Sequence, residues 1–317
     1  MASIGKRPIA NSGLEVAPLA LGGNVFDWTA DEATSFAILD AFVDAGGNMI
    51  DTADVYSAWV PGHKGGESER LIGRWLKRDP AKRDKVVIAT KVGMAAGLAP
   101  DVVAAACDAS LERLGVETID LYYQHKDDES VPLADSLKAF DDQAKAGKIR
   151  AIGLSNFTPG RLAEACIIAR VDGFPAVSAL QPWYSMLERQ KYEDGLREVA
   201  AKEGLAVFPY YSLANGFLTG KYRSADDLGK SPRGLRNVEY LQGRGQRVLA
   251  ALDEVAAETG AALASIALAW TMAQPTITAP IASATSMEQA RELIAALTLE
   301  LTPAQMQRLD EASATAD

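Results

Sequence analysis

The feature that most constrains the fold of this chain is a repeat of short apolar runs, each followed by a stretch of helical periodicity. The runs are unbroken rather than alternating, which is typical of strands that are buried on both faces. Strands that alternate with helices build a parallel sheet. We predict eight strands, at residues 19–23, 48–51, 85–91, 119–125, 149–155, 176–181, 205–210 and 276–279.

Eight such units predict a (β/α)8 barrel, the TIM barrel. The competing architecture is a doubly wound sheet, but no Gly-x-Gly-x-x-Gly lies between an early strand and its helix. The 317 residues exceed the usual length of one domain, yet barrels of about 250 residues or more fold as single domains. We therefore predict one barrel domain over residues 1–317.

Helices are predicted between the strands, and three additions to the barrel are expected. A hairpin around Asn11-Ser12-Gly13 opens the chain, and a C-terminal helix begins at Thr302-Pro303. A long loop at 212–240, rich in glycine and basic residues, follows the seventh strand and leads to an extra helix. The first helix opens at a capping box at 29–32 and runs to Gly46. The other predicted helices are 66–78, 100–115, 133–146, 158–170, 188–203, 245–259, 262–273 and 287–297.

The composition is that of an ordinary globular protein with an acidic balance. The 32 basic and 42 acidic residues give a net charge of −10, which disfavours a nucleic-acid partner. No run approaches 18 apolar residues, and the N-terminal segment lacks the apolar region of a signal peptide. We therefore predict a cytoplasmic protein with no membrane segment. Cys107 and Cys166 lie in apolar, helix-like stretches and are expected to be structural thiols.

Polar residues follow the predicted strands at the end where barrel enzymes carry their catalytic groups. Asp51 and Tyr56 follow the second strand, Lys91 ends the third and His125 ends the fourth. Alone, each has an ordinary interpretation as a loop acid, a pocket tyrosine, a strand-end lysine or a structural histidine. Because they come from adjacent strand ends, we interpret them together as a candidate site. The other histidine, His63, lies in a glycine-rich loop. Because the chain has only these two histidines and its acids are scattered, we predict no metal site.

The chemistry that fits these side chains is proton transfer to an oxygen atom. An unperturbed phenol titrates near about 10. A nearby ammonium favours the phenolate, so we expect Lys91 to lower the pKa of Tyr56 while Asp51 balances the lysine. His125 would orient a carbonyl oxygen or help relay the proton. The set contains no nucleophile and no metal, so protonation of an oxygen as hydride reaches carbon fits better than hydrolysis.

The chain resembles the aldo-keto reductase family from end to end. The resemblance rests on Asp-Thr-Ala-x-x-Tyr at 51–56, Gly-Gly-Glu-Ser-Glu at 65–69, Ala-Thr-Lys at 89–91, His125, Gly-Leu-Ser-Asn at 153–156 and Tyr-Ser-Leu-Ala-Asn-Gly-Phe-Leu-Thr-Gly-Lys-Tyr at 211–222. It implies an oxidoreductase that interconverts an aldehyde or ketone with the corresponding alcohol. In that reaction Tyr56 would donate or accept the proton. Lys91 and Asp51 would tune Tyr56, and His125 would position the substrate.

The resemblance further implies a nicotinamide cofactor that lies extended across the mouth of the barrel. Matching positions assign the carboxamide to Ser155, Asn156 and Gln181, and stacking on the nicotinamide ring to Tyr210. The loop after the seventh strand and the last barrel helix would hold the rest of the cofactor. These further residues are Ser212, Leu213, Asn215, Lys221, Arg233, Ser283, Thr285, Gln289 and Glu292.

The identity of the dinucleotide depends on the residues expected around the adenosine. Many members of the family place a basic residue at the positions of Ser283 or Gln289, where it binds the 2′-phosphate of NADP. Neither residue is basic here, so Arg233 or Arg291 would have to reach the phosphate. We predict NADP(H), with NAD(H) as the alternative.

Four aromatic residues are expected to frame the substrate pocket, because they lie in loops that follow predicted strands: Trp28, Trp59, Trp183 and Tyr184. Such a mouth suits sugars, ketones and bulky alcohols alike. A second hypothesis is a regulatory subunit, because channel β subunits resemble this family and use the barrel as a cofactor-dependent partner. A third is a dehydratase-like barrel without redox chemistry. The sequence predicts no oligomeric state.

Overall fold

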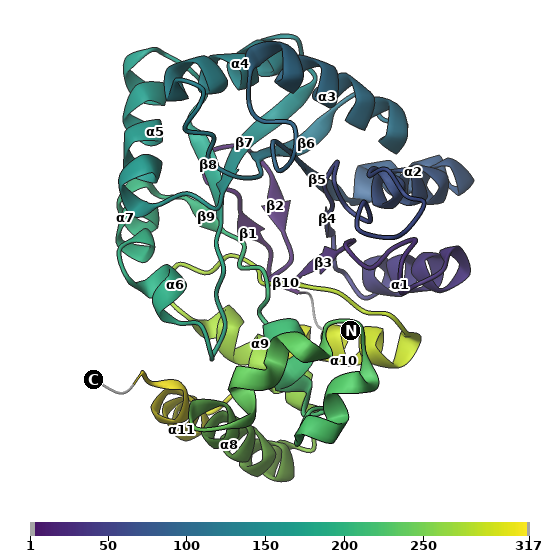
Figure 1. Cartoon of the computed structure of the whole chain (residues 1–317), viewed down its shortest axis with the longest axis vertical. Helices are drawn as coiled ribbons and strands as arrows, with labels where there is room; N and C mark the ends of the chain where they lie inside the picture. The colour runs from purple at the N-terminus through teal and green to yellow at the C-terminus, as the bar shows by residue number, and fades with distance from the viewer. Residues whose placement is uncertain (1–3, 316–317) are drawn as a thin grey trace.

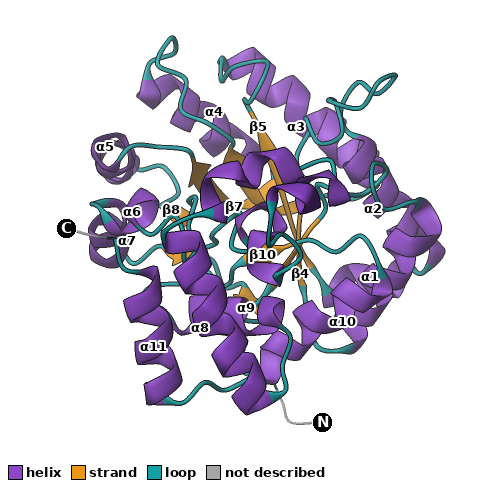
Figure 2. Cartoon of the chain, turned by 60° about the horizontal axis from the view of Figure 1, so that its bottom comes forward, coloured by secondary structure: helices purple, strands orange, loops and turns teal. Residues whose placement is uncertain are grey.

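The centre of the protein is a curled sheet of eight parallel strands, surrounded by helices (Figure 1, Figure 2). The structure is a computed structural model that describes residues 4–315. Neighbours in the sheet are also neighbours along the chain, apart from the last strand, which lies beside the first. The strands, in sheet order, are β10 (Ile281–Ala282), β3 (Ala20–Gly22), β4 (Met49–Asp51), β5 (Val87–Val92), β6 (Ile119–Gln124), β7 (Ile149–Ser155), β8 (Val177–Gln181) and β9 (Ala206–Val207).

The two ends of the sheet are joined by backbone hydrogen bonds. The amide of Thr278 donates to the carbonyl of Val207 at 2.9 Å, and the amide of Ile281 donates to the carbonyl of Pro209 at 2.8 Å. Residues 278–281, which include the first residue of β10, therefore pair with residues 207–209, while β10 also pairs with β3. This closure confirms the predicted (β/α)8 barrel.

Helices follow the strands and pack on the outer face of the sheet (Figure 2). As predicted, α8 is an extra helix before α9, and the C-terminal helix α11 packs beside it. The helices are α1 (Glu32–Asp44), α2 (Glu67–Arg78), α3 (Pro100–Leu114), α4 (Leu133–Lys145), α5 (Pro159–Val171), α6 (Gln190–Glu193), α7 (Leu196–Glu203), α8 (Arg244–Thr259), α9 (Leu263–Ala273), α10 (Met287–Ala295) and α11 (Pro303–Ser313).

The predicted N-terminal hairpin covers the end of the barrel where the strands begin. Its strands are β1 (Arg7–Pro8) and β2 (Glu15–Val16). Leu14 and Val16 belong to the same buried cluster as Met49, at the start of β4. Arg7 fastens the hairpin, since its Nη1 donates to the carbonyls of residues 272, 277 and 278 at 3.1, 2.9 and 3.1 Å. The opposite end of the barrel, where the strands end, is left accessible to a ligand.

The eighth strand was predicted at 276–279, and that prediction is wrong. Ile277 forms an isolated bridge with Val207, and Thr276 has a positive φ of 71°. Pro280 interrupts the segment because it has no N–H to donate. The regular pairing with β3 begins only at Ile281.

Apart from shifts of one or two residues, three other elements differ from the prediction. The predicted helix at 188–203 is split into α6 and α7 at Gly195, whose φ of 90° is outside the helical range. The seventh strand is short because Pro209 cannot donate to a neighbouring strand. The first helix is capped by Asp31, which accepts from the amide of Thr34 at 2.8 Å, and not by Thr29.

The long loop at 212–240 contains three 3-10 helices: η2 (Ala214–Thr219), η3 (Ala225–Lys230) and η4 (Gly234–Leu241). Among residues 4–315, no single helix has the length and apolar character needed to cross a membrane. The helices α8 and α9 pass that test only as a pair, with a bend of 100° between them.

Candidate active site

The four predicted catalytic residues meet where β4, β5 and β6 end. Asp51 is the last residue of β4, Lys91 lies near the end of β5, and His125 directly follows β6. Tyr56 reaches back over these strand ends from the loop after β4. Lys91 Nζ donates to Asp51 Oδ2 at 2.6 Å, to the carbonyl of Thr52 at 2.7 Å and to the Tyr56 hydroxyl at 3.0 Å. The lysine therefore uses all three of its N–H donors.

Lys91 and Asp51 form an ion pair that is shielded from water. Their side chains are 0% and 2% exposed. Burial lowers the pKa of Lys91 because it disfavours the charged form, while the charge of Asp51 acts in the opposite direction. The other carboxylate oxygen of Asp51 accepts from Gln181 Nε2 at 2.9 Å. Both oxygens of the acid are thereby fixed in place.

The Tyr56 hydroxyl lies 3.0 Å from Lys91 Nζ and 3.4 Å from Asp51 Oδ2. We expected the lysine to bring the pKa of this phenol below its ordinary value, and for the net shift that expectation is wrong. Burial, followed by the negative charge of Asp51, raises the pKa of Tyr56 well above its ordinary value. The phenol is therefore protonated at neutral pH and can donate its proton.

His125 faces the phenol across the cavity. The two ring centroids are 6.0 Å apart and the rings are inclined at 74°. Burial lowers the pKa of His125 well below its ordinary value, and the charge of Lys91 acts in the same direction. The imidazole is therefore neutral at pH 7. Its Nδ1 is buried and has no hydrogen-bond partner among the described residues.

The residues predicted to hold the carboxamide form one hydrogen-bonded group beside the catalytic residues. Asn156 Nδ2 donates to the carbonyl of His125 at 2.8 Å, and Asn156 Oδ1 accepts from the Tyr210 hydroxyl at 2.7 Å. Ser155 Oγ donates to the carbonyl of Gln181 at 2.9 Å. Asn156 has a positive φ of 57°, a strained conformation of the kind that concentrates at functional sites.

A cavity of about 810 Å³ runs from these residues to the last barrel helix. Its size is within the range of about 300–1,000 Å³ that is usual for small-molecule and cofactor sites. Tyr56 and His125 line one part of it, and Lys91 lies beneath them. All thirteen residues predicted to bind the cofactor also line it: Ser155, Asn156, Gln181, Tyr210, Ser212, Leu213, Asn215, Lys221, Arg233, Ser283, Thr285, Gln289 and Glu292.

The wall of the cavity after β9 has the chemistry of an anion site. Tyr211, Ala214 and Asn215 have positive φ values of 57°, 46° and 54°, which is uncommon for residues with side chains. Lys221 lies beside this turn. The side-chain oxygen of Asn215 and the indole nitrogen of Trp183 are buried without a partner among the described residues. Lys221 suits a phosphate of an extended dinucleotide, and the indole N–H can donate to one of its oxygens. The Asn215 oxygen is an acceptor and can bind only a donor, such as a ribose hydroxyl.

The far end of the cavity is partly built by the cap of α10. Gln289 Oε1 accepts from the amide and the hydroxyl of Thr285 at 2.9 and 3.1 Å, and Ser286 caps the helix. Glu288 and Glu292 line the same end, and burial raises the pKa of Glu292, with Glu288 adding to the effect. This end therefore has the hydrogen-bonding groups for a ribose but is acidic.

Three of the four aromatic residues predicted to frame the substrate pocket line the cavity: Trp28, Trp59 and Trp183. Tyr184 is the exception and corrects the predicted pocket. Its ring is buried and stacked on Trp270 at a centroid distance of 5.9 Å, and its hydroxyl donates to Glu193 at 2.7 Å. Consecutive residues of an extended segment point in opposite directions, so Trp183 and Tyr184 cannot both face the cavity.

Several lining residues were missed in the sequence, and two of them bear on the shape of the site. Tyr211 contacts Trp183 edge to face at 5.4 Å, and Asn24 accepts from Ser283 Oγ at 2.7 Å. Asn24 could have been found from the sequence, because it follows the glycines at the end of the first strand. Tyr211 depends on a positive φ, which residue type does not reveal.

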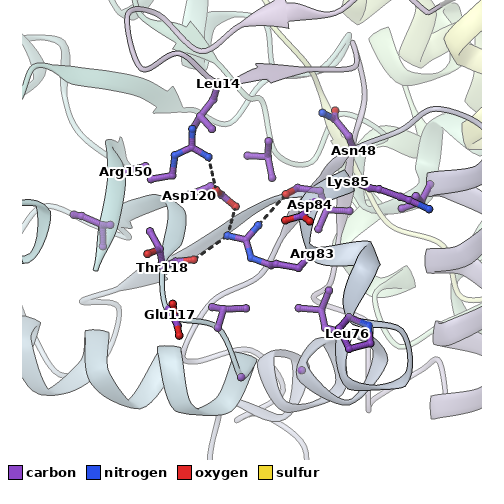
Figure 3. Close-up of a pocket in the computed structure, with 18 of the residues that line it drawn as sticks. Leu14, Asn48, Leu76, Arg83, Asp84, Lys85, Glu117, Thr118, Asp120 and Arg150 are labelled. Carbon is purple, nitrogen blue, oxygen red and sulfur yellow. Dashed lines mark hydrogen bonds and ion pairs between the residues drawn. The ribbon is translucent and has the colours of Figure 1, made fainter. Parts of the chain in front are cut away.

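A second, wider cavity of about 1890 Å³ lies at the opposite end of the barrel, where the strands begin (Figure 3). Its cations are largely paired. Arg83 and Arg150 both bind Asp120, at 2.8 and 3.1 Å. It contains none of the predicted catalytic residues, so the smaller cavity is the candidate active site. Among the described residues, no group of three or more His, Cys, Asp or Glu side chains could hold a metal ion.

Comparison with known proteins identifies the family. The model of the aldo/keto reductase family matches residues 18–314. The chain is 33% identical over 304 residues to an uncharacterized oxidoreductase, YrpG, of Bacillus subtilis, covering 92% of this chain and 91% of the relative. It is also 33% identical over 327 residues to protein tas of Escherichia coli, covering 92% and 93%. The aldo-keto reductase yakc [NADP(+)] of Schizosaccharomyces pombe is 29% identical over 305 residues, covering 91% and 85%. The chain therefore belongs to the aldo/keto reductase family and is an NAD(P)-dependent oxidoreductase.

Proposed function

We propose that this enzyme interconverts an aldehyde or ketone with the corresponding alcohol, and that Tyr56 is the proton donor and acceptor. The observation that carries the proposal is the contact of 3.0 Å between the Tyr56 hydroxyl and the buried ammonium of Lys91, at the wall of the cavity. The nicotinamide, when bound, supplies the hydride for the carbonyl carbon. The protein supplies the proton for the oxygen.

In the reducing direction the Tyr56 hydroxyl donates its proton to the carbonyl oxygen. The resulting phenolate is stabilised by Lys91, because a neighbouring ammonium favours the charged form of the phenol. Asp51 keeps this ammonium charged against the effect of burial. In the oxidising direction the phenolate accepts the proton of the alcohol. Such positioned acid–base groups contribute about 10²–10⁴-fold to the rate.

His125 orients the substrate in this proposal. A neutral imidazole has one N–H donor, which can hydrogen-bond to the carbonyl oxygen beside the phenol. The aromatic rings of Trp59 and Trp28 continue from Tyr56 along the cavity, at centroid distances of 6.1 and 5.4 Å. They would hold the apolar part of the substrate and exclude water from the reacting atoms.

We propose NADP(H) as the cofactor, with NAD(H) as the alternative. The name of the yeast relative yakc includes NADP(+), which supports this preference. Lys221 beside the strained turn after β9 suits the pyrophosphate, which both dinucleotides carry. The carboxamide would be held by Ser155, Asn156 and Gln181, and the nicotinamide ring would stack on Tyr210. The adenosine would be held by Ser283, Thr285, Gln289 and Glu292. Because Glu288 and Glu292 make that end acidic, a parallel titration with NADPH and NADH is decisive. Markedly tighter binding of NADH would overturn the preference.

The role of Tyr56 is tested by Tyr56→Phe, with Tyr122→Phe as the matched control. Both variants remove a single hydroxyl, and the Tyr122 hydroxyl is buried without a partner in the described part of the chain. We expect kcat for an aldehyde to fall by about 10²–10⁴-fold in Tyr56→Phe and to change little in the control. The affinity for NADPH should be unchanged in both. Full activity of Tyr56→Phe would exclude the mechanism.

The same measurement addresses the regulatory-subunit hypothesis. A subunit that uses the barrel mainly to bind a partner would bind the cofactor and show little turnover, with or without the Tyr56 hydroxyl. A small-molecule carbonyl substrate and a cytoplasmic location complete the proposal.

A further inference from the structure

We propose that Glu69 is a positioning residue for the reaction, and that its carboxylate keeps the ammonium of Lys91 charged from the outer side of the sheet. Glu69 ends the motif Gly-Gly-Glu-Ser-Glu at 65–69, to which the proposed mechanism gives no role. The inference rests on the proposed function, because it concerns the ammonium that stabilises the phenolate of Tyr56. It adds a second acid to Asp51, which acts on the same lysine from inside the barrel.

The first turn of α2 is hydrogen-bonded to the residues that follow or precede the two charged catalytic residues in the sequence. Ser68 Oγ accepts from Thr52 Oγ1 at 2.8 Å, and Glu69 Oε1 accepts from Thr90 Oγ1 at 2.6 Å. All four of these residues are buried. Successive residues of a strand point to opposite faces, so Thr90 faces outward while Lys91 points into the barrel. Helix α2 therefore holds a carboxylate directly behind the catalytic end of β5 (Figure 1).

Glu69 is paired with a cation from the neighbouring helix. Its side chain is 0% exposed, and its Oε2 accepts from Arg113 Nε at 2.6 Å. Arg113 belongs to the last turn of α3 and passes Gly66, where a Cβ atom would lie 2.5 Å from the arginine Cδ. Apolar residues of similar volume often replace a buried ion pair without loss of stability. Stability is therefore a weak reason for a buried charge at this position, and the charge itself is the property to explain.

The charge of Glu69 acts on Lys91 across the sheet. Burial lowers the pKa of Lys91, and three carboxylates act against that effect, first Asp51 and then Asp54 and Glu69. Asp54 is tied to the same strand, because its amide donates to the carbonyl of Lys91 at 3.1 Å. Burial raises the pKa of Asp54 to about 6, and the charge of Glu69 adds to that effect. Two acids outside the sheet thus support the ammonium that Asp51 supports from within.

The other titratable groups around Glu69 come from three elements of the described structure. Asp54 lies in the loop after β4, Arg113 and Cys107 belong to α3, and Tyr122 belongs to β6. Burial raises the pKa of Cys107 to about 12 and the pKa of Tyr122 well above its ordinary value, so both groups are neutral through pH 9. The charges that act behind Lys91 are therefore those of Glu69, Asp54 and Arg113.

The test uses two residues that share one contact but have opposite charges. Glu69→Gln and Arg113→Gln both break the ion pair of 2.6 Å, so a purely structural role predicts the same change in both variants. An electrostatic role predicts opposite changes. Loss of the acid lets Lys91 release its proton at a lower pH, whereas loss of the cation leaves Glu69 uncompensated and raises that pH.

The first readout is kcat/KM for the reduction of 4-nitrobenzaldehyde at saturating NADPH, followed from pH 6 to pH 10.5. The value should fall at alkaline pH as Lys91 and Tyr56 lose their protons. We expect the midpoint of this fall to be lower by about 0.5–1 pH unit in Glu69→Gln and higher by about 0.2–0.5 pH unit in Arg113→Gln. Shifts in the same direction, or no shift in Glu69→Gln, would overturn the inference.

Glu32→Gln and Arg74→Gln are the matched controls. They break another ion pair of 2.6 Å, which joins α1 to α2 and whose arginine and glutamate side chains are 44% and 49% exposed. Because water and salt screen such a pair, neither control should move the midpoint by more than about 0.2 pH unit. Controls that shifted it as far as Glu69→Gln does would remove the special role of Glu69.

Urea unfolding keeps this inference separate from the proposed function. If the intact protein reduced no aldehyde, the proposed function would be contradicted, but the charge of Lys91 could still be followed. The unfolding free energy rises with pH where the folded protein has lost the lysine proton and the unfolded chain still binds it. Between pH 7 and pH 9.5 this rise should begin at a lower pH in Glu69→Gln than in the intact protein, and at a higher pH in Arg113→Gln.

The same onset in the intact protein and both variants would refute the inference. If Glu69→Gln did not fold, Arg113→Gln would decide alone. An onset at higher pH than in the intact protein would support the role of Glu69, and an unchanged or lower onset would overturn it.

Discussion

Replacing Asp51 with asparagine should destabilise the protein, and the loss should depend on pH. The substitution keeps the shape of the side chain but leaves the Lys91 ammonium, 2.6 Å away and fully buried, without its counter-charge. Removing one partner of a buried ion pair costs about 3–5 kcal/mol. The alternative, release of the lysine proton at pH 7, costs about 4.6 kcal/mol because an unfolded lysine titrates near about 10.4. Both routes predict a similar loss of unfolding free energy.

The direction of the pH effect follows from the lysine. Burial lowers the pKa of Lys91 in the folded protein, so between that pKa and about 10.4 the unfolded chain binds more protons. The unfolding free energy therefore rises with pH in this window. Asp51→Asn removes a charge that raises the pKa of Lys91, so the window extends toward neutral pH. The deficit of about 3–5 kcal/mol at pH 7 should shrink to about 1–2 kcal/mol at pH 9.5.

Urea unfolding followed by tryptophan fluorescence measures this difference, with the intact protein examined at each pH. At pH 7 the loss corresponds to a decrease in melting temperature of about 5–8 °C for a chain of this length. Asp84→Asn, at an exposed position, is the control and should change the unfolding free energy by less than about 0.5 kcal/mol. A loss in Asp51→Asn that is equal at pH 7 and pH 9.5 would refute the coupling to Lys91.

Three further predictions concern the same site. Gln181→Glu places a second acid where an amide now donates to Asp51 at 2.9 Å. A pH profile of kcat should therefore show a fall of about tenfold or more at pH 8 and a recovery toward pH 5.5. Gly153→Ala would bring a methyl group within 2.3 Å of the Tyr123 ring and should cost about 1–3 kcal/mol in urea unfolding. The rate of alcohol oxidation should rise with pH through the alkaline range, because the raised pKa of Tyr56 keeps the phenolate that accepts the proton scarce at lower pH. A rate that does not depend on pH would contradict the role of Tyr56 as proton acceptor.

The architecture and the four catalytic candidates could be predicted because they depend on local patterns. Unbroken apolar runs indicated strands that are buried on both faces, and residues at the ends of parallel strands had to meet at one end of the barrel. The polar residues of that end, such as Asp51 and Lys91, could therefore be grouped before any contact was known. The eighth strand was misplaced because residues 276–279 are apolar enough for a strand but pair with β9 irregularly around Pro280.

Properties that depend on distant contacts could not be predicted. The pKa of Tyr56 rises because the whole barrel mouth shields the phenol, and the sequence revealed only the neighbouring lysine. Tyr184 is held in the core by Trp270, which lies far along the chain. The contact between Arg233 and Trp28 depends on the path of a long loop, for which no residue pattern gives the direction.

The bonds of Arg7 have a consequence for how the chain can reach its native state during synthesis. Its guanidinium binds carbonyls of residues 272, 277 and 278, which lie more than 260 positions later in the sequence. Contacts over such distances form late, because a long loop must close before they contribute. The N-terminal hairpin is made first and can pack early at the start of β4, where Asn48 Nδ2 donates to the carbonyl of Glu15 at 2.9 Å. The bonds of Arg7, however, can form only after residue 278 has left the ribosome. A chain that is truncated before this point should therefore hold its hairpin less firmly, which faster amide hydrogen exchange in the hairpin would reveal.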